Sequence, residues 1–425
     1  MDLQGECKPN GKMSYKTRDI VPRSRIPACK AGNAARVIRR SIDMILQSKK
    51  VWMADRFVPA QIVVEDGKIA EIYPYGTKEA DVDYGDQWVL PGFIDVHCHG
   101  AFGFDTNDAE PEGLRKWLRG IVKEGVTSLL PTTITQSEEV LTKALENVAN
   151  VVEEGYTGAE VLGVHFEGPF LDMLYKGAQP EQHIKRPVVE QFKHYQEAAH
   201  GLIKYITMAT ENDEGFALTR YCTETGVVVS IGHSAATFDQ AVMACAHGAR
   251  SMTHVYNGMS PFNHRQNGLV GAAYNIKSMY GEIICDGNHS TPAALKQFFE
   301  LKGPHYGMMV SDALMAKGSP AGSKFLFGGN EIEIYPDGSA HLTSTKGLAG
   351  STLCINKGLR LLIEEAMVPI ETAINSCTKN PAECLRVADR KGSIKVGLDA
   401  DLVVLDRDYE VVQTYCAGKS MLDGE

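Results

Sequence analysis

The chain has 425 residues, a formal net charge of −10, 44% hydrophobic residues and 23% charged residues. It is long enough for one large α/β domain with a smaller second domain, and its composition is that of a folded globular protein. The negative charge argues against a nucleic-acid partner, and no apolar run reaches the roughly 18–20 residues that cross a bilayer, so we expect no membrane partner. A small anionic substrate is compatible with this charge, because local basic residues form such a site.

The ten cysteines are scattered singly, without a Cys-x-x-Cys pair or the dense spacing of a disulfide scaffold. We recognise no secretory signal before them. We therefore expect reduced thiols in a cytoplasmic protein.

Residues 1–50 are predicted to form an irregular, basic N-terminal extension. Lysines and arginines alternate there with Pro and Gly, and a periodic apolar pattern is almost absent from the first 40 residues. The scattered acidic residues and the lack of an apolar segment favour a frayed extension over a targeting peptide. We assign this region no function.

Two β-rich regions flank the rest of the chain, at 51–90 and 386–425. In the first, Asp66-Gly67 separates two short apolar runs, which is a strong signal for a β-hairpin. The second contains the apolar run 402–405, which is also typical of a short strand. We expect both ends to pair into one small β-sandwich domain.

The centre of the chain, 91–385, alternates strand-like apolar runs with helical stretches. Such alternation predicts a (β/α)8 TIM barrel of the metal-dependent hydrolase type, although the spacing alone does not exclude an open doubly wound sheet. The expected strands are 93–99, 126–134, 161–167, 203–209, 227–233, 251–255, 280–286 and 306–312.

The first of these runs ends in His97-Cys98-His99-Gly100. Side chains two apart in a strand share a face, so both imidazoles point the same way. One histidine in the core and one capping a loop would be the alternative interpretation. Two imidazoles on one face at the carboxyl end of a strand are better explained as ligands of a divalent cation.

Further polar residues fall at the ends of the other expected strands. Carboxyl ends of parallel strands meet at one edge, where barrel enzymes carry their sites. A solvated turn residue is the alternative for the carboxylate that precedes Gly168-Pro169, and His165 is expected to pack behind the site. The residues at the strand ends are Glu167, His233, His254, His289 and Asp312.

These side chains fit a hydrolytic site with two metal ions. One ion would be bound by the first histidine pair and the other by His233 and His254, with Glu167 reaching both. Asp312 would lie near the water between the ions, which would supply hydroxide near neutral pH, and would accept and return its proton. His289 would hydrogen-bond an oxygen that becomes negative in the transition state.

Two segments could recognise an anion such as phosphate. Asn257-Gly258 and the loop that carries His264 and Arg265 offer backbone donors and a guanidinium. The glycine-rich run 346–352 offers further N–H groups, which by itself is a weak signal.

Taken together, these segments resemble the N-acetylglucosamine-6-phosphate deacetylases of the amidohydrolase superfamily. The resemblance rests on the whole set and runs from about 89 to 352, with a further match near 397–403. The segments that carry it are 91–100, 165–170, 232–234, 253–259, 286–289, 311–313 and 347–351.

The resemblance implies hydrolysis of the acetamide of N-acetyl-D-glucosamine 6-phosphate to D-glucosamine 6-phosphate and acetate, in amino-sugar catabolism and cell-wall sugar recycling. It implies two divalent cations per subunit, zinc being favoured over iron, manganese or cobalt, and a homodimer in which Arg265 reaches the neighbouring subunit's phosphate. His289 would hold the acetyl carbonyl. The substrate contacts it implies are Ala178, Asn257, Gly258, His264, Arg265, Leu348, Ala349 and Gly350.

Three other functions remain to be weighed. Tyr256 and Gly258 depart from the residues common in the family, which leaves the galactosamine epimer as an alternative substrate. A cyclic-amide hydrolase would need a bridging lysine at the end of the fourth strand, and 206–211 contains none. A non-catalytic scaffold on the same fold is disfavoured, because every expected metal ligand is present.

Overall fold

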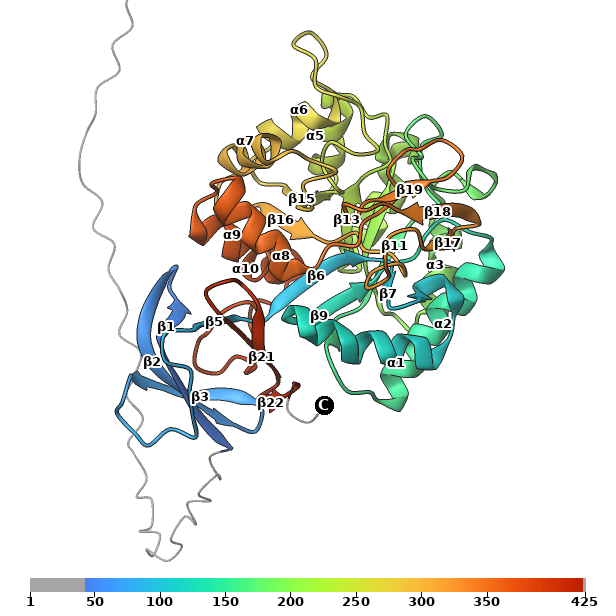
Figure 1. Cartoon of the computed structure of the whole chain (residues 1–425). Coiled ribbons are helices and arrows are strands. Elements are labelled where there is room, and N and C mark those ends of the chain that lie inside the picture. Colours follow the sequence, from blue (N-terminus) through green and yellow to red (C-terminus); the bar gives the residue numbers. More distant parts are fainter. Residues whose placement is uncertain (1–42, 423–425) are drawn as a thin grey trace, which may run out of the picture. The chain divides into compact units, whose positions relative to one another are not determined.

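Strands from both ends of the chain pair in one sheet of eight strands (Figure 1). The structure is a computed structural model that describes residues 43–422, within the unit Ser41–Glu425. Most of the expected basic extension therefore lies outside the described residues. The sheet strands are β1 (Met44–Met53), β2 (Arg56–Glu65), β3 (Lys68–Pro74), β4 (Val82–Asp83), β5 (Trp88–Pro91), β20 (Leu402–Leu405), β21 (Val411–Cys416) and β22 (Lys419–Ser420).

The antiparallel pairing of β5 with β20 joins the two ends, and it confirms that both contribute to one sheet. The predicted hairpin is also confirmed, because Asp66 and Gly67 link β2 to β3 with φ values of 50° and 73°. Positive φ at both positions is what a two-residue hairpin turn of type I′ requires.

The sheet begins earlier than the boundary at residue 51 that the sequence indicated, because β1 starts at Met44. The register of β1 against β2 shifts between Ser48 and Val51. That irregularity and the exposed pair Lys49-Lys50 interrupt the alternation of apolar and polar residues, so the first half of the strand resembled the basic extension.

Parallel strands form the centre of the molecule. A sheet of three strands has the order β10-β9-β6, and a sheet of six strands runs from β11 to β16 in sequence order. Parallel bridges from Thr132 to His165 and from Cys98 to Ala313 join the two sheets at both edges, so the parallel sheet is curled. The strands are β6 (Phe93–Cys98), β9 (Val126–Pro131), β10 (Glu160–Val161), β11 (Val164–Glu167), β12 (Ile203–Met208), β13 (Val228–Ile231), β14 (Ser251–Met252), β15 (Tyr280–Ile284) and β16 (Gly307–Val310).

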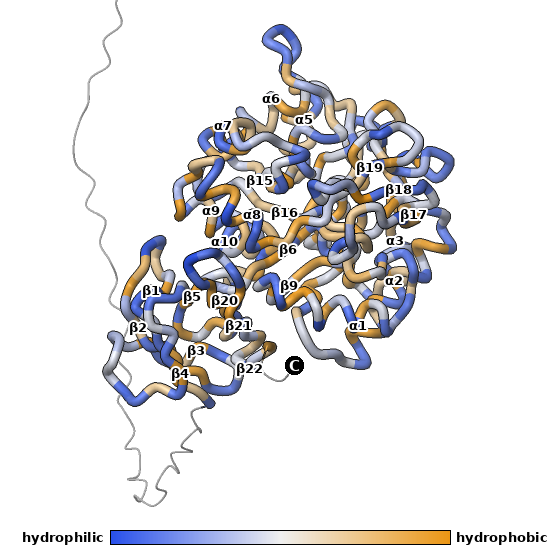
Figure 2. Tube along the Cα trace, in the orientation of Figure 1, coloured by the Kyte–Doolittle hydropathy of each residue, from blue (hydrophilic) through white to orange (hydrophobic). Residues whose placement is uncertain are grey.

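Helices separate these strands along the chain. Every residue of β6 and β9 is buried, which is expected of parallel strands covered on both faces, and both strands carry hydrophobic stretches in Figure 2. The helices are α1 (Pro111–Gly120), α2 (Glu138–Glu154), α3 (Val189–Ala198), α4 (Ala217–Glu224), α5 (Phe238–Ala246), α6 (Gly268–Asn275), α7 (Pro292–Lys302), α8 (Ile355–Arg360), α9 (Ile370–Ser376) and α10 (Lys379–Cys384).

A small antiparallel sheet was not predicted from the sequence. It consists of β17 (Lys324–Phe327), β18 (Asn330–Ile334) and β19 (Ala340–Leu342), in that order. Its inner face packs Phe327 and Ile332 against Leu314 and Ala349. Within residues 43–422, no helix has both the length and the apolar character needed to cross a membrane.

Lys302, at the end of α7, is expected to contribute strongly to stability. The residue is 4% exposed, and its ammonium donates to the carbonyl oxygens of Ala273 and Met279 at 3.1 and 2.5 Å. Lys302→Met would leave buried carbonyls without a partner and should lower the free energy of unfolding by about 2–4 kcal/mol. Urea unfolding followed by tryptophan fluorescence measures the loss. Lys296→Met, on the exposed face of the same helix, should change stability by less than about 0.5 kcal/mol, and an equal loss in both variants would contradict this role.

Candidate active site

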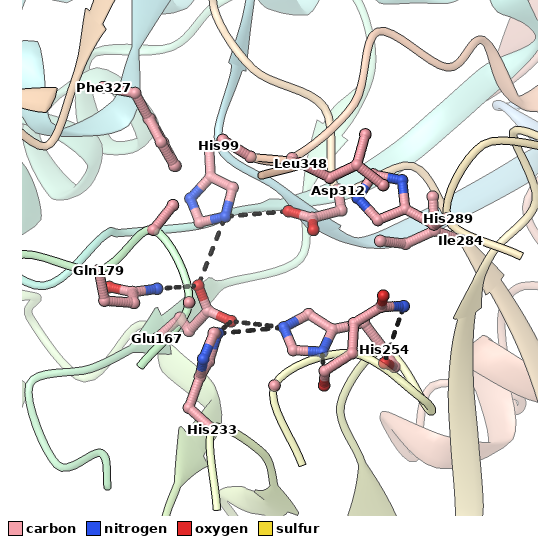
Figure 3. A pocket seen from close by; sticks show the side chains of 16 residues that line it. His99, Glu167, Gln179, His233, His254, Ile284, His289, Asp312, Phe327 and Leu348 are labelled. Carbon is pink, nitrogen blue, oxygen red and sulfur yellow. Dashed lines mark hydrogen bonds and ion pairs between the residues drawn. The ribbon is translucent and has the colours of Figure 1, made fainter. Parts of the chain in front are cut away.

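Six of the predicted residues meet at the carboxyl edge of the parallel strands, and all of them except His97 are labelled in Figure 3. His97 lies in β6, the second histidine of the pair follows it directly, and Glu167 is the last residue of β11. The others come two residues after β13, β14 and β16. The six are His97, His99, Glu167, His233, His254 and Asp312, and each is at most 7% exposed.

Their donor atoms form two adjoining groups. In the first group, which is His97, His99 and Asp312, the ligand atoms lie within 4.8 Å of one another. His99 Nε2 is 3.1 Å from Asp312 Oδ1. The second group is Glu167, His233 and His254, and its ligand atoms also lie within 4.8 Å of one another. Glu167 Oε1 lies 3.3 Å from His233 Nε2 and 3.4 Å from His254 Nε2.

Glu167 connects the two groups. Its Oε1 is also 3.5 Å from His97 Nε2, and its Oε2 is 3.5 Å from His99 Nε2. Figure 3 shows this carboxylate between the imidazoles of His99, His233 and His254. One carboxylate can therefore reach ligands of both groups, as the sequence led us to expect.

The outer nitrogens of three histidines are held by neighbouring groups. His233 Nδ1 donates to the carbonyl oxygen of Tyr175 at 2.8 Å, and His254 Nδ1 donates to that of Asn257 at 3.1 Å. His97 Nδ1 lies 2.8 Å from a carboxylate oxygen of Glu282. Because carbonyl and carboxylate oxygens accept, the protons lie on Nδ1 and the Nε2 lone pairs face the centre of the cluster.

A divalent cation fits this cluster on the chemistry of its atoms. His97 Nε2 and Glu167 Oε1 are buried and have no hydrogen-bond partner within the described protein. Buried polar atoms without partners are costly, and a cation would satisfy both. Imidazole and carboxylate ligands suit zinc, iron, manganese and cobalt.

The charges of the cluster depend on one another. Burial raises the pKa of Glu167, but the neighbouring His97 and His233 outweigh burial and hold it well below its ordinary value. Burial also opposes ionisation of Asp312, yet His97 and His99 lower its pKa to about 2. Both carboxylates are therefore ionised at neutral pH, which is the state that ligates metal.

Three of the six residues have a left-handed backbone. The φ values are 46° at His233, 27° at His254 and 48° at Asp312. This conformation is strained for residues other than glycine and cannot continue a strand. It is held at Asp312 by hydrogen bonds from its N–H to His97 O at 2.8 Å and from Ser351 N–H to its carbonyl at 2.7 Å.

A cavity of about 270 Å³ opens beside the cluster. His289 is on its wall and keeps its Nδ1 2.7 Å from a carboxylate oxygen of Asp286. Gly258 needs to be glycine here, because its φ is +56° and an added Cβ would lie 2.9 Å from His233 Nδ1. Predicted residues that line the cavity are His99, Glu167, Ala178, His233, His254, Asn257, Gly258, His289, Asp312, Leu348, Ala349 and Gly350.

Two of the predicted substrate contacts lie away from the other site residues of the same chain. His264 and Arg265 are exposed in the loop before α6 and do not line this cavity. Arg265 instead borders a neighbouring hollow of about 1010 Å³ together with Tyr175. His165 packs behind the site as expected, since its nitrogens lie 2.9 Å from Val96 O and 2.7 Å from Thr207 Oγ1.

Sequence reasoning missed Glu282 and Gln179. Glu282 is the sole carboxylate of the buried strand β15, and that isolation was the signal that could have revealed it. Gln179 donates from Nε2 to Glu167 Oε2 at 2.8 Å and accepts from the N–H of Thr135 at 2.9 Å. It thereby fixes the carboxylate plane of Glu167.

Comparisons with known proteins identify the family of the chain. The model of the amidohydrolase family matches residues 88–421. The N-acetylglucosamine-6-phosphate deacetylase of Bacillus subtilis (strain 168) is 40% identical over 366 residues, which cover 84% of this chain and 91% of that protein. The N-acetylgalactosamine-6-phosphate deacetylase of Escherichia coli O157:H7 is 32% identical over 374 residues, covering 88% and 97%.

A solved structure gives the same result. The N-acetyl-D-glucosamine-6-phosphate deacetylase of Mycobacterium smegmatis superposes with a TM-score of 0.84 at 27% sequence identity, covering 89% of this chain and 99% of the other. The family match and the relatives at 32–40% identity each span most of the chain. The chain therefore belongs to the amidohydrolase family, among its N-acetylglucosamine-6-phosphate deacetylases.

Proposed function

We propose that the protein hydrolyses the acetamide of N-acetyl-D-glucosamine 6-phosphate to D-glucosamine 6-phosphate and acetate with the help of divalent cations. The observation that carries the proposal is the cluster of four imidazoles and two carboxylates on one edge of the parallel strands, with an adjoining cavity. The names of the two relatives given above describe deacetylases of phosphorylated amino sugars. Amino-sugar catabolism and cell-wall sugar recycling are the processes in which this reaction would serve.

The proposed architecture is a (β/α)8 barrel over about 91–385. β6, β9 and the six strands from β11 to β16 supply eight parallel strands, and the two bridges between their edges support closure. The small domain, proposed as a β-sandwich, would combine 51–90 and 386–425 with the earlier half of β1.

We propose two cations per subunit, with zinc the favoured ion. The two groups of ligand atoms support this number, and Glu167 would reach both ions. When bound, such cations lower the pKa of water and polarise a carbonyl oxygen.

The protein's own groups would move the protons. Asp312, beside His99 at 3.1 Å, would accept the proton of the attacking water and pass it to the amide nitrogen. This transfer matters because an amine leaves poorly unless it is protonated. Burial opposes protonation of His289, but Asp286 raises its pKa above the ordinary value, so its imidazolium would donate from Nε2 to the acetyl carbonyl.

The sugar would lie between Ala178 and the backbone of 348–350, with its phosphate near Asn257 and Gly258. Arg265 lies outside the cavity of its own chain, which supports a homodimer in which it reaches the neighbouring subunit's site. The eight described cysteines are free, in keeping with a cytoplasmic location.

The substrate assignment predicts strong dependence on the phosphate. We expect kcat/KM for N-acetylglucosamine 6-phosphate to exceed that for N-acetylglucosamine by about 100-fold or more, because charge-assisted contacts to phosphate would be lost. Acetate release from both sugars, and from N-acetylgalactosamine 6-phosphate, measures the preference. The second candidate function is deacetylation of N-acetylgalactosamine 6-phosphate, which the similarity to the Escherichia coli relative supports. Faster turnover of the galactosamine epimer would favour it. Equal rates with and without phosphate would contradict the assignment.

A further inference from the structure

Glu282 is a buried carboxylate outside the set of proposed metal ligands. It lies in the middle of β15, between Gly281 and Ile283, and is 0% exposed. Burying a carboxylate costs several kcal/mol unless it is paired or hydrogen-bonded. Within residues 43–422, no lysine or arginine forms an ion pair with it, so its partners must be sought among other groups.

Those partners belong to both halves of the cluster. Glu282 Oε2 is 2.8 Å from His97 Nδ1 and accepts from the backbone N–H of His254 at 3.4 Å. Its Oε1 accepts from the hydroxyl of Tyr205 at 2.5 Å. One side chain thus connects a histidine of the first pair with the backbone of a histidine of the second pair.

The first pair depends on Glu282 more than the second pair does. His233 and His254 hold their Nδ1 atoms against backbone carbonyls, which no side-chain substitution removes. His99 Nδ1 is buried and has no hydrogen-bond partner in the part of the chain that the structure describes. His97 is therefore the one imidazole of its pair with an oriented Nδ1, and Glu282 is the group that orients it.

We propose that Glu282 is a positioning residue that gives the His97–His99 half of the cluster its affinity for a divalent cation. This inference rests on the proposed function, because it assumes that metal binds the cluster. By accepting from Nδ1, Glu282 turns the Nε2 lone pair of His97 toward the centre and makes that nitrogen a stronger ligand. The geometry predicts a selective effect on one of two ions.

The charge of Glu282 favours a second ion as well. Glu167, Asp312 and Glu282 place three carboxylates in or beside the cluster, and in the described part of the chain their ion-pair partners are histidines alone. One divalent cation would leave this buried region with a net negative charge, whereas two would offset it. Coulombic attraction in a dry interior is strong enough to matter for the second binding step.

Direct ligation by Glu282 is the alternative. His97, His165 and Glu282 also present ligand atoms within 4.8 Å of one another. Both nitrogens of His165 are engaged, with Val96 O and Thr207 Oγ1, and both oxygens of Glu282 already accept hydrogen bonds. Because both side chains are already held by these neighbours, the contacts favour a positioning role for Glu282 over ligation of a third ion.

The test is the number and affinity of bound Zn²⁺ ions, measured by titrating metal-free protein against a chromophoric chelator. We expect two sites in the unaltered protein. Glu282→Gln should weaken one site by about 10–100-fold and leave the other unchanged. When both proteins are loaded with Co²⁺ instead, the visible absorption of only one of the two ions should differ between Glu282→Gln and the unaltered protein. Tyr205→Phe, which removes the hydroxyl donor to Glu282, should weaken the same site to a smaller extent.

Asp213→Asn is the matched control, because Asp213 is a carboxylate 5% exposed that accepts from the N–H groups of Leu218 and Thr219 in α4. It should reduce stability without changing either metal site. The inference is overturned if the unaltered protein binds one ion only, if both sites of Glu282→Gln keep their affinity or weaken equally, or if a third equivalent is lost. Should Glu282→Gln fail to fold, an unchanged Tyr205→Phe overturns it. Acetate release by the unaltered protein tests the proposed function separately.

Discussion

Replacing Asp312 with Asn is expected to lower kcat by about 1,000-fold or more while the protein keeps its metal. An amide side chain has the shape of the carboxylate and can still lie beside His99, which Asp312 Oδ1 now approaches to 3.1 Å. It cannot accept a proton from water and return it to the leaving nitrogen. General acid–base groups contribute about 100–10,000-fold, and this carboxylate would serve in both directions.

The measurement is kcat together with metal content in the same preparation. Asp239→Asn, in α5 and outside the cavity, is the control and should keep full activity. Loss of metal from Asp312→Asn would assign Asp312 mainly to ligation. Turnover within about tenfold of the unaltered protein would remove it from the proposed mechanism.

Replacing Glu167 with Gln should abolish both metal binding and turnover. Oε1 of Glu167 approaches three imidazole nitrogens at 3.3–3.5 Å and has no hydrogen-bond partner among residues 43–422. The substitution removes the anionic ligand proposed to be shared by both ions. The glutamine side chain is neutral, so it would not offset the positive charge of cations bound beside it. We expect less than one bound ion per chain after dialysis and a loss of about 1,000-fold or more in kcat/KM.

Metal analysis by mass spectrometry and acetate release would be run side by side on this variant. The buried control Asp213→Asn should retain both properties. Two ions retained by Glu167→Gln would contradict the bridging role of the carboxylate, even if activity were lost.

The strand pattern and most of the site could be predicted from the sequence, because both depend on local periodicity. His97 and His99 reveal themselves by spacing alone, and apolar runs mark each parallel strand. The runs were nevertheless expected to be longer than the strands are. At His233, His254 and Asp312 the backbone turns left-handed, which ends each strand before the proposed site residue.

Other features depend on contacts that no local pattern contains. Glu282 lies in mid-strand, so a search for polar residues at strand ends passes it over, and its role depends on His97, which is distant in sequence. Gly328-Gly329 between β17 and β18 was a usable hairpin signal, since both residues have positive φ. Arg265 is different, because its proposed partner is on another chain.

Metal-dependent acetate release from N-acetylglucosamine 6-phosphate tests the central claim most directly. The protein would be stripped with a chelator, assayed, reloaded with Zn²⁺ and assayed again, with bound zinc counted at each stage. We expect turnover to disappear with the metal and to return in proportion to reloaded zinc, up to two ions per chain. Acetate release that is unchanged after the metal has been removed, or absent when both sites are filled, would contradict the account.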